Sequence, residues 1–526
     1  MRTLLHQLIS HQASILPELP ALGCKEVWLS YAQLQQRVEQ VTQALLSCGL
    51  QTQQRVAIYL PKEIEAVLAM FATSCARGIF VPINPVLKAA QVTHILKDSE
   101  TSILITNLSR WRTLAEQKPT SVELVVVLDL PEHEQTDRVI TWQAFMASGK
   151  NQALPVGLET DLAAILYTSG STGKPKGVVL SQRNMVLGAA SVAQYLDSRT
   201  TDRMLAALPL SFDYGFSQLS IAFTVGASCY MMELLFPQDI ILAVERERIN
   251  CLALVPPMWI KLARVQWPEK VAKQIRYFTN SGGAMPIPVL QQLQQQLPEA
   301  EPYMMYGLTE AFRSCYLPPK DISSKPGSFG KAIPNVELRV INEFGAECRA
   351  NEAGELVHFG PLVSQGYWND KEKTLERFKP VPATLPILRQ QVGVWSGDIV
   401  TRDEEGYFYF VGRNDEMIKT SGYRVSPTEL EEVIYQSGLT LEAVVLGVPH
   451  PELGQGIVLL VVLDPSKATC VSLIQNLCRS QLPNYMQPKS VIALDTLPRN
   501  GNGKIDRKAL LSQYQQHFAI KEGSYE

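Results

Sequence analysis

Short apolar runs alternate with longer amphipathic stretches along most of the chain. Runs typical of buried strands occupy 55–60, 102–106, 123–130 and 251–255, and apolar residues recur at helical spacing across 31–50. Strands that alternate with helices in this way are typical of βαβ units and mainly parallel sheets. We therefore expect an α/β fold, with a large N-terminal body of mainly parallel sheets flanked by helices.

The pattern changes near Asp415. Strand-like runs with period two lie on either side of this residue, at 407–411 and 417–425. The helices and strands that follow are expected at 428–438, 442–448, 457–464 and 471–482. They form a compact α+β set of the size of a small domain. We expect an N-terminal domain at 1–413 and a smaller α+β lobe at 414–526.

Composition and charge narrow the classes of protein. The chain has 526 residues, of which 46% are apolar, and its formal net charge is −3. A chain of this length can bury a large core, and so small a net charge provides no general attraction for nucleic acid or anionic membrane. No apolar run reaches the length of a membrane-spanning helix. The nine cysteines include no CxxC pair, which favours reduced thiols over disulfides or a zinc site, so we expect a cytoplasmic protein.

The segment YTSGSTGKPKG at 167–177 is too polar and too rich in glycine for a core element. Its glycines let backbone N–H groups approach a ligand, its hydroxyls are donors, and Lys174 and Lys176 add positive charge. Together these groups favour a cradle for phosphates, placed after the buried strand at 162–166. The spacing excludes a Walker A loop, because no glycine stands five residues before Gly173 and no Ser or Thr follows Lys174. Composition alone leaves a surface loop without a ligand as the alternative.

The segment YGLTE suits the base, the phosphates and the metal of a nucleotide. Tyr306 can stack on a flat ring, Thr309 can donate to a phosphate, and Glu310 can hold Mg²⁺, which prefers carboxylate and phosphate oxygens. Taken alone, Glu310 is more often a residue that caps a turn.

Two further clusters complete the pattern. Asp398 in WSGD can accept both hydroxyls of a ribose, and Arg413 in VGRNDE can reach the same nucleotide. Lys504 in RNGNGKIDRK lies on a turn between glycines, directly before a helix. Taken alone, Asp398 is more often an acid before a turn, and Lys504 is one solvated lysine among many.

Together and in this order, these segments resemble those of the AMP-forming adenylating enzymes, a superfamily of acyl-CoA synthetases, luciferases and adenylation domains of nonribosomal peptide synthetases. The matching segments span 167–508: YTSGSTGKPKGVVLSQRN, NSGGAMP, MMYGLTE, GELVHFGPLVSQGYW, WSGD, YFYFVGRNDEMIKTSGYRVSPTELE and LPRNGNGKIDRK. The resemblance implies the adenylating-enzyme fold, whose C-terminal lobe is mobile, with ATP and Mg²⁺ as cofactors. It implies an acyl adenylate and pyrophosphate as first products. The acyl group then passes to the thiol of coenzyme A or of a carrier protein's phosphopantetheine arm.

The resemblance also assigns roles to individual residues. The phosphates would be held by Thr168, Ser169, Gly170, Ser171, Thr172, Gly173 and Lys176, and the adenine would be bordered by Gly282, Gly283, Ala284, Tyr306 and Gly307. The remaining nucleotide contacts would be Thr309 to the α-phosphate, Glu310 to Mg²⁺, and Asp398 with Arg413 to the ribose. The catalytic residues would be Lys504, which bridges the carboxylate and the α-phosphate, Lys176, and Gly422, whose segment helps to admit the thiol. Asp415 would be the hinge between the lobes.

The acid that is activated is indicated by Asp213 in LPLSFDYGFSQL. Amino-acid-activating members of the superfamily usually carry an Asp at this position, where it pairs with the substrate ammonium, and a buried acid without a cation is costly. The alternative is that Asp213 bonds to backbone or to Arg313, which replaces the usual apolar residue and can itself pair with a second acid. By the same resemblance the pocket would be lined by Asp213, Tyr214, Ser217, Leu254, Thr279, Ser281, Met305, Arg313 and Ser314. Tyr214 and Met305 would make it small.

The chain ends shortly after Lys504, which leads us to expect a stand-alone ligase whose carrier protein is a separate chain. It is similar to L-prolyl carrier-protein ligases of the anatoxin, prodigiosin and pyoluteorin type, and to acyl-CoA ligases of exopolysaccharide loci. We therefore favour L-proline as the substrate, with an acyl-CoA ligase for another carboxylic acid as the alternative. A nucleotide sensor without catalysis is a rival from a different class, which the presence of Lys504 disfavours.

Overall fold

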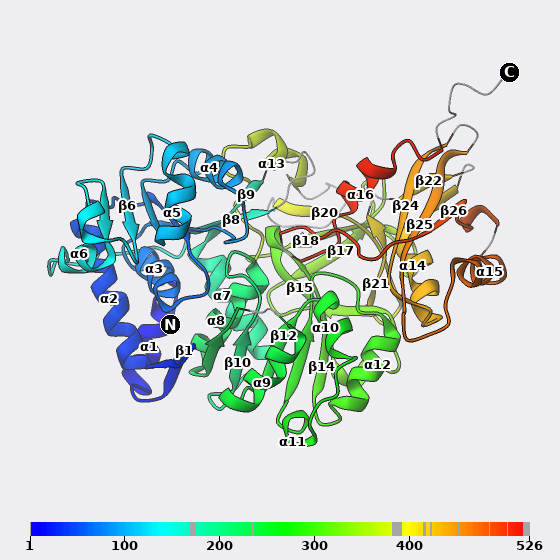
Figure 1. Ribbon diagram of the computed structural model, residues 1–526, viewed down its shortest axis with the longest axis horizontal. Helices are drawn as coiled ribbons and strands as arrows, with labels where there is room; N and C mark the ends of the chain where they lie inside the picture. Colours follow the sequence, from blue (N-terminus) through cyan, green and yellow to red (C-terminus); the bar gives the residue numbers. More distant parts are fainter. Residues whose placement is uncertain are drawn as a thin grey trace.

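The computed structural model describes residues 2–168, 175–233, 236–380, 392–413, 417–420, 423–450, 453–482, 484–501 and 503–518. Within them the chain forms three β-sheets, two in a large N-terminal body that contains α1 to β21 and one in a C-terminal lobe that contains β22 to α16. The lobe lies to the right in Figure 1. The predicted fold class, with a large body and a small C-terminal domain, is confirmed.

The first sheet has the order β7-β6-β5-β3-β4-β8-β9 and is parallel except for the pair β8 and β9. Its strands are β3 (Arg55–Tyr59), β4 (Ile79–Pro82), β5 (Ile103–Thr106), β6 (Leu124–Val127), β7 (Val139–Thr141), β8 (Leu162–Thr168) and β9 (Lys176–Ser181). The apolar runs expected at 55–60, 102–106 and 123–130 are therefore strands of this sheet. Helices cover both of its faces, which explains why these runs are continuously apolar.

The second sheet is larger and mixed, with the order β17-β18-β20-β21-β16-β15-β14-β13-β12-β10-β11-β1-β2 and β19 beside β20. Neighbouring strands in the part β14-β13-β12-β10-β11-β1 are parallel. Neighbouring strands in the part β17-β18-β20-β21-β16-β15-β14 are antiparallel. The strands of this sheet are β1 (Pro20–Cys24), β2 (Val27–Ser30), β10 (Arg203–Ala206), β11 (Ser228–Met231), β12 (Cys251–Leu254), β13 (Tyr277–Asn280), β14 (Glu301–Leu308), β15 (Phe312–Leu317), β16 (Ser328–Ala332), β17 (Glu337–Ile341), β18 (Gly354–Phe359), β19 (Phe378–Pro380), β20 (Val392–Arg402) and β21 (Phe408–Arg413). The antiparallel second half of this sheet is a feature that the expectation of mainly parallel sheets did not contain.

Helices fill the space between the two sheets and cover their outer faces. The main core lies between the sheets around α2, α3, α7 and α8, while α4 and α5 cover the first sheet and α9, α10 and α12 cover the second. The helices of the body are α1 (Gln7–Ile15), α2 (Tyr31–Ser47), α3 (Ile64–Cys75), α4 (Ala89–Asp98), α5 (Leu108–Leu114), α6 (Trp142–Ala147), α7 (Gln182–Tyr195), α8 (Asp213–Val225), α9 (Pro237–Glu247), α10 (Pro256–Leu262), α11 (Glu269–Ala272), α12 (Ile287–Gln296) and α13 (Lys371–Arg377). None of the helices in the described part of the chain is long and apolar enough to cross a membrane.

Local signals fix where several of these helices begin and end. Ser181 and Asn184 form a capping box at the start of α7, so this helix begins at Gln182. At the end of α8, Gly226 adopts a φ of +80° and stops the helix in the left-handed conformation. Because α8 follows β10 after a short connection, its first residue, Asp213, lies beyond the carboxyl end of that strand.

The C-terminal lobe has a small sheet of order β23-β22-β25-β24, with β26 beside β25. Its elements are β22 (Ile418–Thr420), β23 (Tyr423–Val425), α14 (Pro427–Gln436), β24 (Thr440–His450), β25 (Gly454–Leu463), α15 (Val471–Gln481), β26 (Ser490–Ala493) and α16 (Arg507–Tyr514). One face of the sheet packs on α14 and α15, and the other packs on α16. The lobe contacts the body through Asn84, whose side-chain amide donates to the backbone oxygen of Gly501 at 2.8 Å.

Candidate active site

Four adjacent parallel strands of the second sheet bring the candidate site together. Asp213 follows β10, Val255 follows β12, the segment 281–284 follows β13, and the segment 306–310 lies at the end of β14. Ligands of α/β proteins bind beyond the carboxyl ends of strands. These polar clusters, which lie up to about a hundred residues apart in the sequence, therefore meet at one edge of the second sheet.

Lys504 reaches this edge from the C-terminal lobe. Its turn is closed by the Lys504 backbone N–H, which donates to Oδ1 of Asn500 at 3.1 Å. A Cβ atom built on Gly282 would lie 3.3 Å from Cε and 3.6 Å from Nζ of Lys504. Gly282 also adopts a φ of +82°, so glycine at this position lets the lysine lie directly against the backbone.

The charge of Lys504 is balanced by carboxylates of the body. Burial lowers the pKa of Lys504, whereas attraction by Asp213 and by Asp398 acts in the opposite direction and repulsion by Arg413 adds to the lowering. Nζ also lies 5.8 Å from the ring centroid of Phe212. Both acids that the sequence predicted to hold parts of the substrates thus attract the ammonium group.

The two residues predicted to hold the ribose are paired with each other. Nη1 of Arg413 donates to Oδ1 of Asp398 at 2.7 Å and to the backbone oxygen of Ser396 at 3.1 Å. Asp398 lies within β20 and not at the end of a strand, and it also accepts a hydrogen bond from the hydroxyl of Tyr306. The ring of Tyr306 packs against Phe329, with the centroids 4.7 Å apart.

The predicted adenine-binding residues come from two neighbouring strands. Gly282, Gly283 and Ala284 follow β13, while Tyr306 and Gly307 lie on β14. The small residues keep this edge open, and the tyrosine supplies an aromatic face.

The predicted metal ligand, Glu310, lies in a short 3₁₀ turn with Thr309, directly after β14. Its Oε1 accepts a hydrogen bond from the hydroxyl of Tyr367 at 2.6 Å, and its Oε2 accepts none from any residue that the structure describes. No group of three or more His, Cys, Asp or Glu side chains in the described ranges could hold a metal ion. A single half-buried carboxylate fits Mg²⁺, which binds one or two protein carboxylates and takes its other ligands from phosphates and water.

The predicted phosphate loop follows β8 and precedes β9. Thr168 and Lys176 are paired at the open end of this antiparallel hairpin, so both lie at the base of the loop. The pKa of Lys176 is lowered by burial and by the neighbouring charge of Lys373, while Asp370 acts in the opposite direction. The predicted residues Ser169, Gly170, Ser171, Thr172 and Gly173 lie outside the described residues, as do Gly422 and Asp415.

The acid pocket contains a buried ion pair. Nη1 of Arg313 donates to Oδ2 of Asp213 at 2.9 Å, and Nη2 donates to Oγ of Ser217 at 3.0 Å. The guanidinium carbon lies 4.4 Å from the ring centroid of Tyr214. Nε of Arg313 has no hydrogen-bond partner among the described residues. The sequence offered Arg313 as an alternative partner for Asp213, and the two side chains are indeed joined.

Phe312 explains how Arg313 enters the pocket. Phe312 adopts a φ of +57°, a strained value for a bulky residue, at the start of β15. A Cβ on Gly188 would lie 2.7 Å from the Phe312 ring, and one on Gly307 would lie 2.4 Å from the Phe312 backbone oxygen. Two glycines therefore make room for the twisted backbone that turns Arg313 inward.

The other predicted pocket residues divide into two groups. The hydroxyls of Tyr214 and Thr279 lie 2.5 Å apart, and the hydroxyl of Tyr195 lies 2.9 Å from Sδ of Met305. Ser281 is buried beyond β13, and Ser314 is buried with an Oγ that has no hydrogen-bond partner in the described part of the chain.

Leu254 is a correction to the predicted pocket. Its side chain packs in the core on the outer face of the second sheet, whereas Tyr214 and Met305 belong to the core on the inner face. Because side chains alternate along a strand, the next residue, Val255, faces the site, with Cγ1 3.5 Å from a Cβ built on Gly282.

Three residues near the site were not predicted from the sequence as site residues. Two of them lie in segments on which the family resemblance rests. Tyr367 bonds Glu310, and Arg377 donates to the backbone oxygen of Trp395 at 2.9 Å. His358 is fully buried beside Tyr306, with ring centroids 6.0 Å apart and an interplanar angle of 22°. Tyrosine, arginine and histidine are common in structural positions, so their residue types alone gave no signal.

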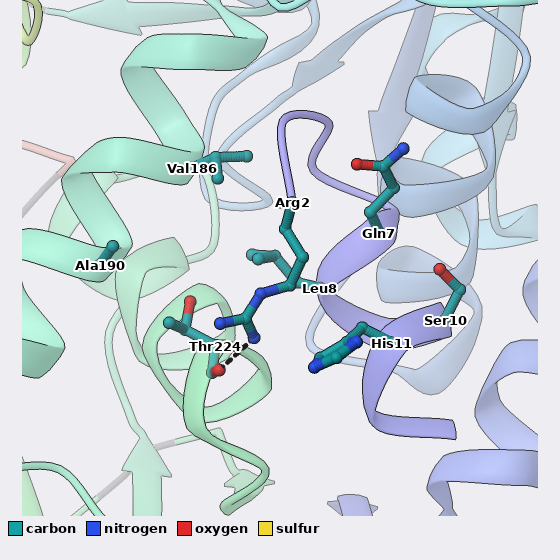
Figure 2. Close-up of a pocket in the computed structure, with 8 residues that line it drawn as sticks. All are labelled: Arg2, Gln7, Leu8, Ser10, His11, Val186, Ala190 and Thr224. Carbon is teal, nitrogen blue, oxygen red and sulfur yellow. Dashed lines mark hydrogen bonds between the residues drawn. The ribbon is translucent and has the colours of Figure 1, made fainter. Parts of the chain in front are cut away.

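A separate open pocket lies between α1, α7 and α8, lined by Arg2, Gln7, Leu8, Ser10, His11, Val186, Ala190 and Thr224 (Figure 2). Its Arg2 side chain donates to the backbone oxygen of Thr224, in the last turn of α8. A cation there caps free carbonyls and complements the helix dipole. Asp213 begins the same helix, roughly 17 Å from Thr224 at 1.5 Å per residue, so the pocket is remote from the candidate site.

Comparison with family models identifies the chain. The model described as AMP-binding enzyme matches residues 9–368, and the model of the AMP-binding enzyme C-terminal domain matches 429–504. The chain belongs to the AMP-binding enzyme family. It is accordingly an AMP-forming ligase that uses ATP.

Relatives of this AMP-binding enzyme include several kinds of ligase. The L-proline–[L-prolyl-carrier protein] ligase of Streptomyces coelicolor is 31% identical, over 92% of this chain and 91% of the relative. A feruloyl-CoA synthase of an Amycolatopsis species is 30% identical, over 94% of this chain and 96% of the relative. A linear gramicidin synthase of Brevibacillus parabrevis is 28% identical over 96% of this chain, which spans only 6% of that relative's length.

A solved structure shows the same architecture. The ATP-bound crystal structure of MatB from Rhodopseudomonas palustris superposes with a TM-score of 0.87, at 26% identity, over 98% of this chain and 100% of that chain. The predicted small C-terminal domain and large sheet body are thus those of a known adenylating enzyme.

Proposed function

We propose that this AMP-binding enzyme activates a small amino acid, with L-proline favoured, as the acyl adenylate. It then transfers the acyl group to the phosphopantetheine thiol of a separate carrier protein. The observation that carries the proposal is that Lys504 and Asp213 meet at the same edge of the second sheet. Nζ of Lys504 lies 5.8 Å from the ring centroid of Phe212, the residue before Asp213, and the Asp213 carboxylate attracts the ammonium.

The argument rests on the spacing of charges in the substrate. An α-amino acid carries its carboxylate and its ammonium on one carbon, so a matching site needs a cation and an anion side by side. Lys504 would hold the carboxylate and Asp213 would hold the ammonium. One oxygen of Asp213 is bonded to Arg313, and Oδ1 accepts no hydrogen bond from the described residues, so it is available to a second donor.

The size of the pocket favours a compact side chain. Tyr214 lies against Arg313, and Tyr195 contacts Met305; both tyrosines and the methionine are bulky and buried or half-buried, so we expect little room for a large substrate side chain. Proline has a small ring and a secondary ammonium with two protons, enough for Asp213 and one backbone carbonyl. The sequence identity to an L-proline–[L-prolyl-carrier protein] ligase supports the same substrate and acceptor.

The chemistry follows from the residues at this edge. Lys504 would neutralise the repulsion between the carboxylate and the α-phosphate and hold them in line. Thr309 would donate to the α-phosphate, and Asp398 with Arg413 would hold the ribose. Mg²⁺, when bound, would supply further positive charge to the phosphates next to Glu310 and Lys176.

We also propose that domains 1–413 and 414–526 rotate about Asp415 between the two half-reactions, so that the segment around Gly422 replaces Lys504.

All nine cysteines are free thiols, which is compatible with a reducing compartment such as the cytoplasm.

A second candidate function is an acyl-CoA ligase for a carboxylic acid without an amine. The observation that favours it is the Asp213–Arg313 pair, because a carboxylate that is already neutralised does not require a cationic substrate. The feruloyl-CoA synthase relatives support this alternative.

Substrate-dependent exchange of pyrophosphate into ATP, measured over all amino acids and a panel of simple carboxylic acids, distinguishes the two. We expect L-proline to give the fastest exchange and cyclopentanecarboxylate, its deaminated analogue, to be a poor substrate. Asp213→Asn should reduce proline-dependent exchange by at least about a hundredfold, since an unpaired buried charge costs about 3 kcal/mol or more. Faster exchange with an aryl or fatty acid would replace the proposal by the alternative. The thiol acceptor is identified by measuring thioester formation with coenzyme A and with a phosphopantetheinylated carrier protein.

A further inference from the structure

Tyr367 lies where the two sheets of the body meet the candidate metal and phosphate site. It is paired with Val178 of β9 through an isolated bridge, and the next residue, Trp368, donates its backbone N–H to Gly177 at 2.7 Å. Its side chain is only 8% exposed and packs edge-on against Phe378, with the ring centroids 5.6 Å apart. The tyrosine is therefore fixed in place.

Its side chain contacts two groups of opposite charge from different sheets. The hydroxyl donates to Oε1 of Glu310, which follows β14 of the second sheet, at 2.6 Å. The ring lies under Nζ of Lys176, on β9 of the first sheet, with 5.4 Å between Nζ and the ring centroid. One residue thus holds the predicted metal ligand and the predicted phosphate-binding cation relative to each other.

This arrangement prevents a competing interaction. Glu310 and Lys176 attract each other, yet they form no ion pair within 4.0 Å in the part of the chain that the structure describes. A direct pair would use the carboxylate that the metal needs and the ammonium that the phosphates need. The Tyr367 hydroxyl holds one carboxylate oxygen, and the ring offers the ammonium a weaker partner that a phosphate can replace.

We infer that Tyr367 is a positioning residue for metal binding, which holds Oε1 of Glu310, leaves Oε2 for Mg²⁺ and keeps Lys176 available for phosphate. The inference rests on the proposed roles of Glu310 and Lys176. It adds to them a residue that does not itself touch the metal or the nucleotide.

The chain provides a matched control. Tyr407 also donates its hydroxyl to a carboxylate, Oδ2 of Asp321, at 2.8 Å. Lysine ammonium groups lie over its ring as well, with Lys331 at 4.2 Å and Lys325 at 4.8 Å from the centroid. Tyr407→Phe removes the same kind of hydrogen bond at a place that no predicted site residue contacts.

The test is a titration of Mg²⁺ that measures ATP binding by calorimetry on the full chain. We expect Tyr367→Phe to raise the Mg²⁺ concentration needed for half-maximal enhancement of ATP binding by about tenfold, since loss of a residue that orients a metal ligand typically costs that much. Affinity for ATP in EDTA should not change, and Tyr407→Phe should match the wild type in both conditions. In pyrophosphate exchange, Tyr367→Phe should raise the KM for Mg²⁺ and leave kcat at saturating Mg²⁺ within about twofold.

Glu310→Gln in the same assay distinguishes the role inferred for Tyr367 from the proposed role of Glu310 as metal ligand. A Mg²⁺ dependence that shifts in Glu310→Gln but not in Tyr367→Phe would overturn the role of Tyr367 alone. No shift in Glu310→Gln would overturn both roles. If Tyr367 acts through Glu310, the double variant should bind Mg²⁺ no worse than Glu310→Gln. Additive losses would show an independent structural effect and would also contradict the inference. Thermal unfolding of each variant tests whether the fold is retained.

Discussion

Arg313 and Asp213 form a buried ion pair at the start of α8, with Nη1 and Oδ2 2.9 Å apart and side-chain exposures of 2% and 5%. Each charge is therefore neutralised by a residue one hundred positions away in the sequence. The pair makes the predicted acid pocket polar but nearly neutral. A substrate ammonium would add to a carboxylate that is already held in a fixed position.

Removal of one partner should destabilise the body strongly. Arg313→Met leaves the Asp213 carboxylate buried and unpaired, and we expect the free energy of unfolding of the N-terminal body to fall by about 3 kcal/mol. Asp213→Leu combined with Arg313→Met removes both charges and should recover most of this loss. The free energies are measured by urea unfolding of the wild type, the single variants and the double variant.

The pair of Arg276 and Asp202 serves as the control, because it is bonded at 3.0 and 2.6 Å at the opposite ends of the same parallel strands. Arg276→Met should also destabilise the body, yet it should leave the KM for the acid substrate unchanged, whereas Arg313→Met should raise it. Additive losses for Asp213→Leu and Arg313→Met would show that the two side chains are not coupled.

Many elements, and the segments assigned to the nucleotide site, could be picked out from the sequence because their signals are local. Apolar runs gave β3, β5, β6 and β12, and the motifs placed Tyr306, Asp398 and Lys504 in segments that the fold brings together. Periodicity and motif order need no knowledge of distant contacts.

The acid pocket could not be predicted in the same way. The partner of Asp213 depends on a twisted backbone at Phe312, and nothing in the residue type of a phenylalanine indicates a positive φ. Leu254 was placed on the wrong face because a shift of one residue along a strand reverses the direction of its side chain. The bond from Tyr367 to Glu310 joins segments 57 residues apart, and only the packing of two sheets brings them together.

His358 should make stability depend on pH. Both of its ring nitrogens lack a hydrogen-bond partner in the described chain, and burial lowers its pKa to about 3. Between this value and the ordinary pKa of about 6.5, the unfolded chain binds a proton that the folded chain does not. The free energy of unfolding therefore falls as the pH falls below about 6.5, by about 1.4 kcal/mol per pH unit from this residue.

We expect His358→Leu to make this pH dependence shallower by that amount, in unfolding measured at pH 7, 6 and 5. His6, whose pKa burial lowers to about 4, should retain its own contribution in the variant. His133 is 83% exposed, so His133→Gln should leave the slope as in the wild type. Equal slopes for the wild type and His358→Leu would mean that the histidine is charged or hydrated in the folded state.

Lys504 should control the rate of adenylation and the pH above which this rate declines. Lys504→Ala should lower the rate of pyrophosphate exchange by about 10²–10³, the usual cost of one well-placed charge in a transition state. Because burial lowers the pKa of Lys504, adenylation should decline as the pH rises through that lowered value. Lys504→Arg should keep part of the activity and move the decline to higher pH, since a guanidinium stays protonated.

Thiol transfer from chemically prepared acyl adenylate should change far less in Lys504→Ala. Lys489→Ala, at an exposed lysine of the same lobe, should match the wild type in both reactions. Near-normal adenylation by Lys504→Ala would contradict the role assigned to this lysine.

The junction between body and lobe should act as the hinge. The last residue of β21, Arg413, is bonded to Asp398 in the candidate nucleotide site, and Met417, which precedes β22 of the lobe, donates its backbone N–H to Arg413 at 3.0 Å. Asp415 lies between them, outside the described residues, and a hinge residue must absorb a large change in φ and ψ.

Proline fixes φ near −65°, so Asp415→Pro should hold the lobe in one orientation, while Asp415→Ala leaves the backbone free. With Lys504 already beside Gly282, we expect Asp415→Pro to retain pyrophosphate exchange and to lose thioester formation, each half-reaction being measured separately. Asp415→Ala should support both. If Asp415→Pro forms adenylate and thioester at wild-type rates, the rotation takes place at another residue or is not needed.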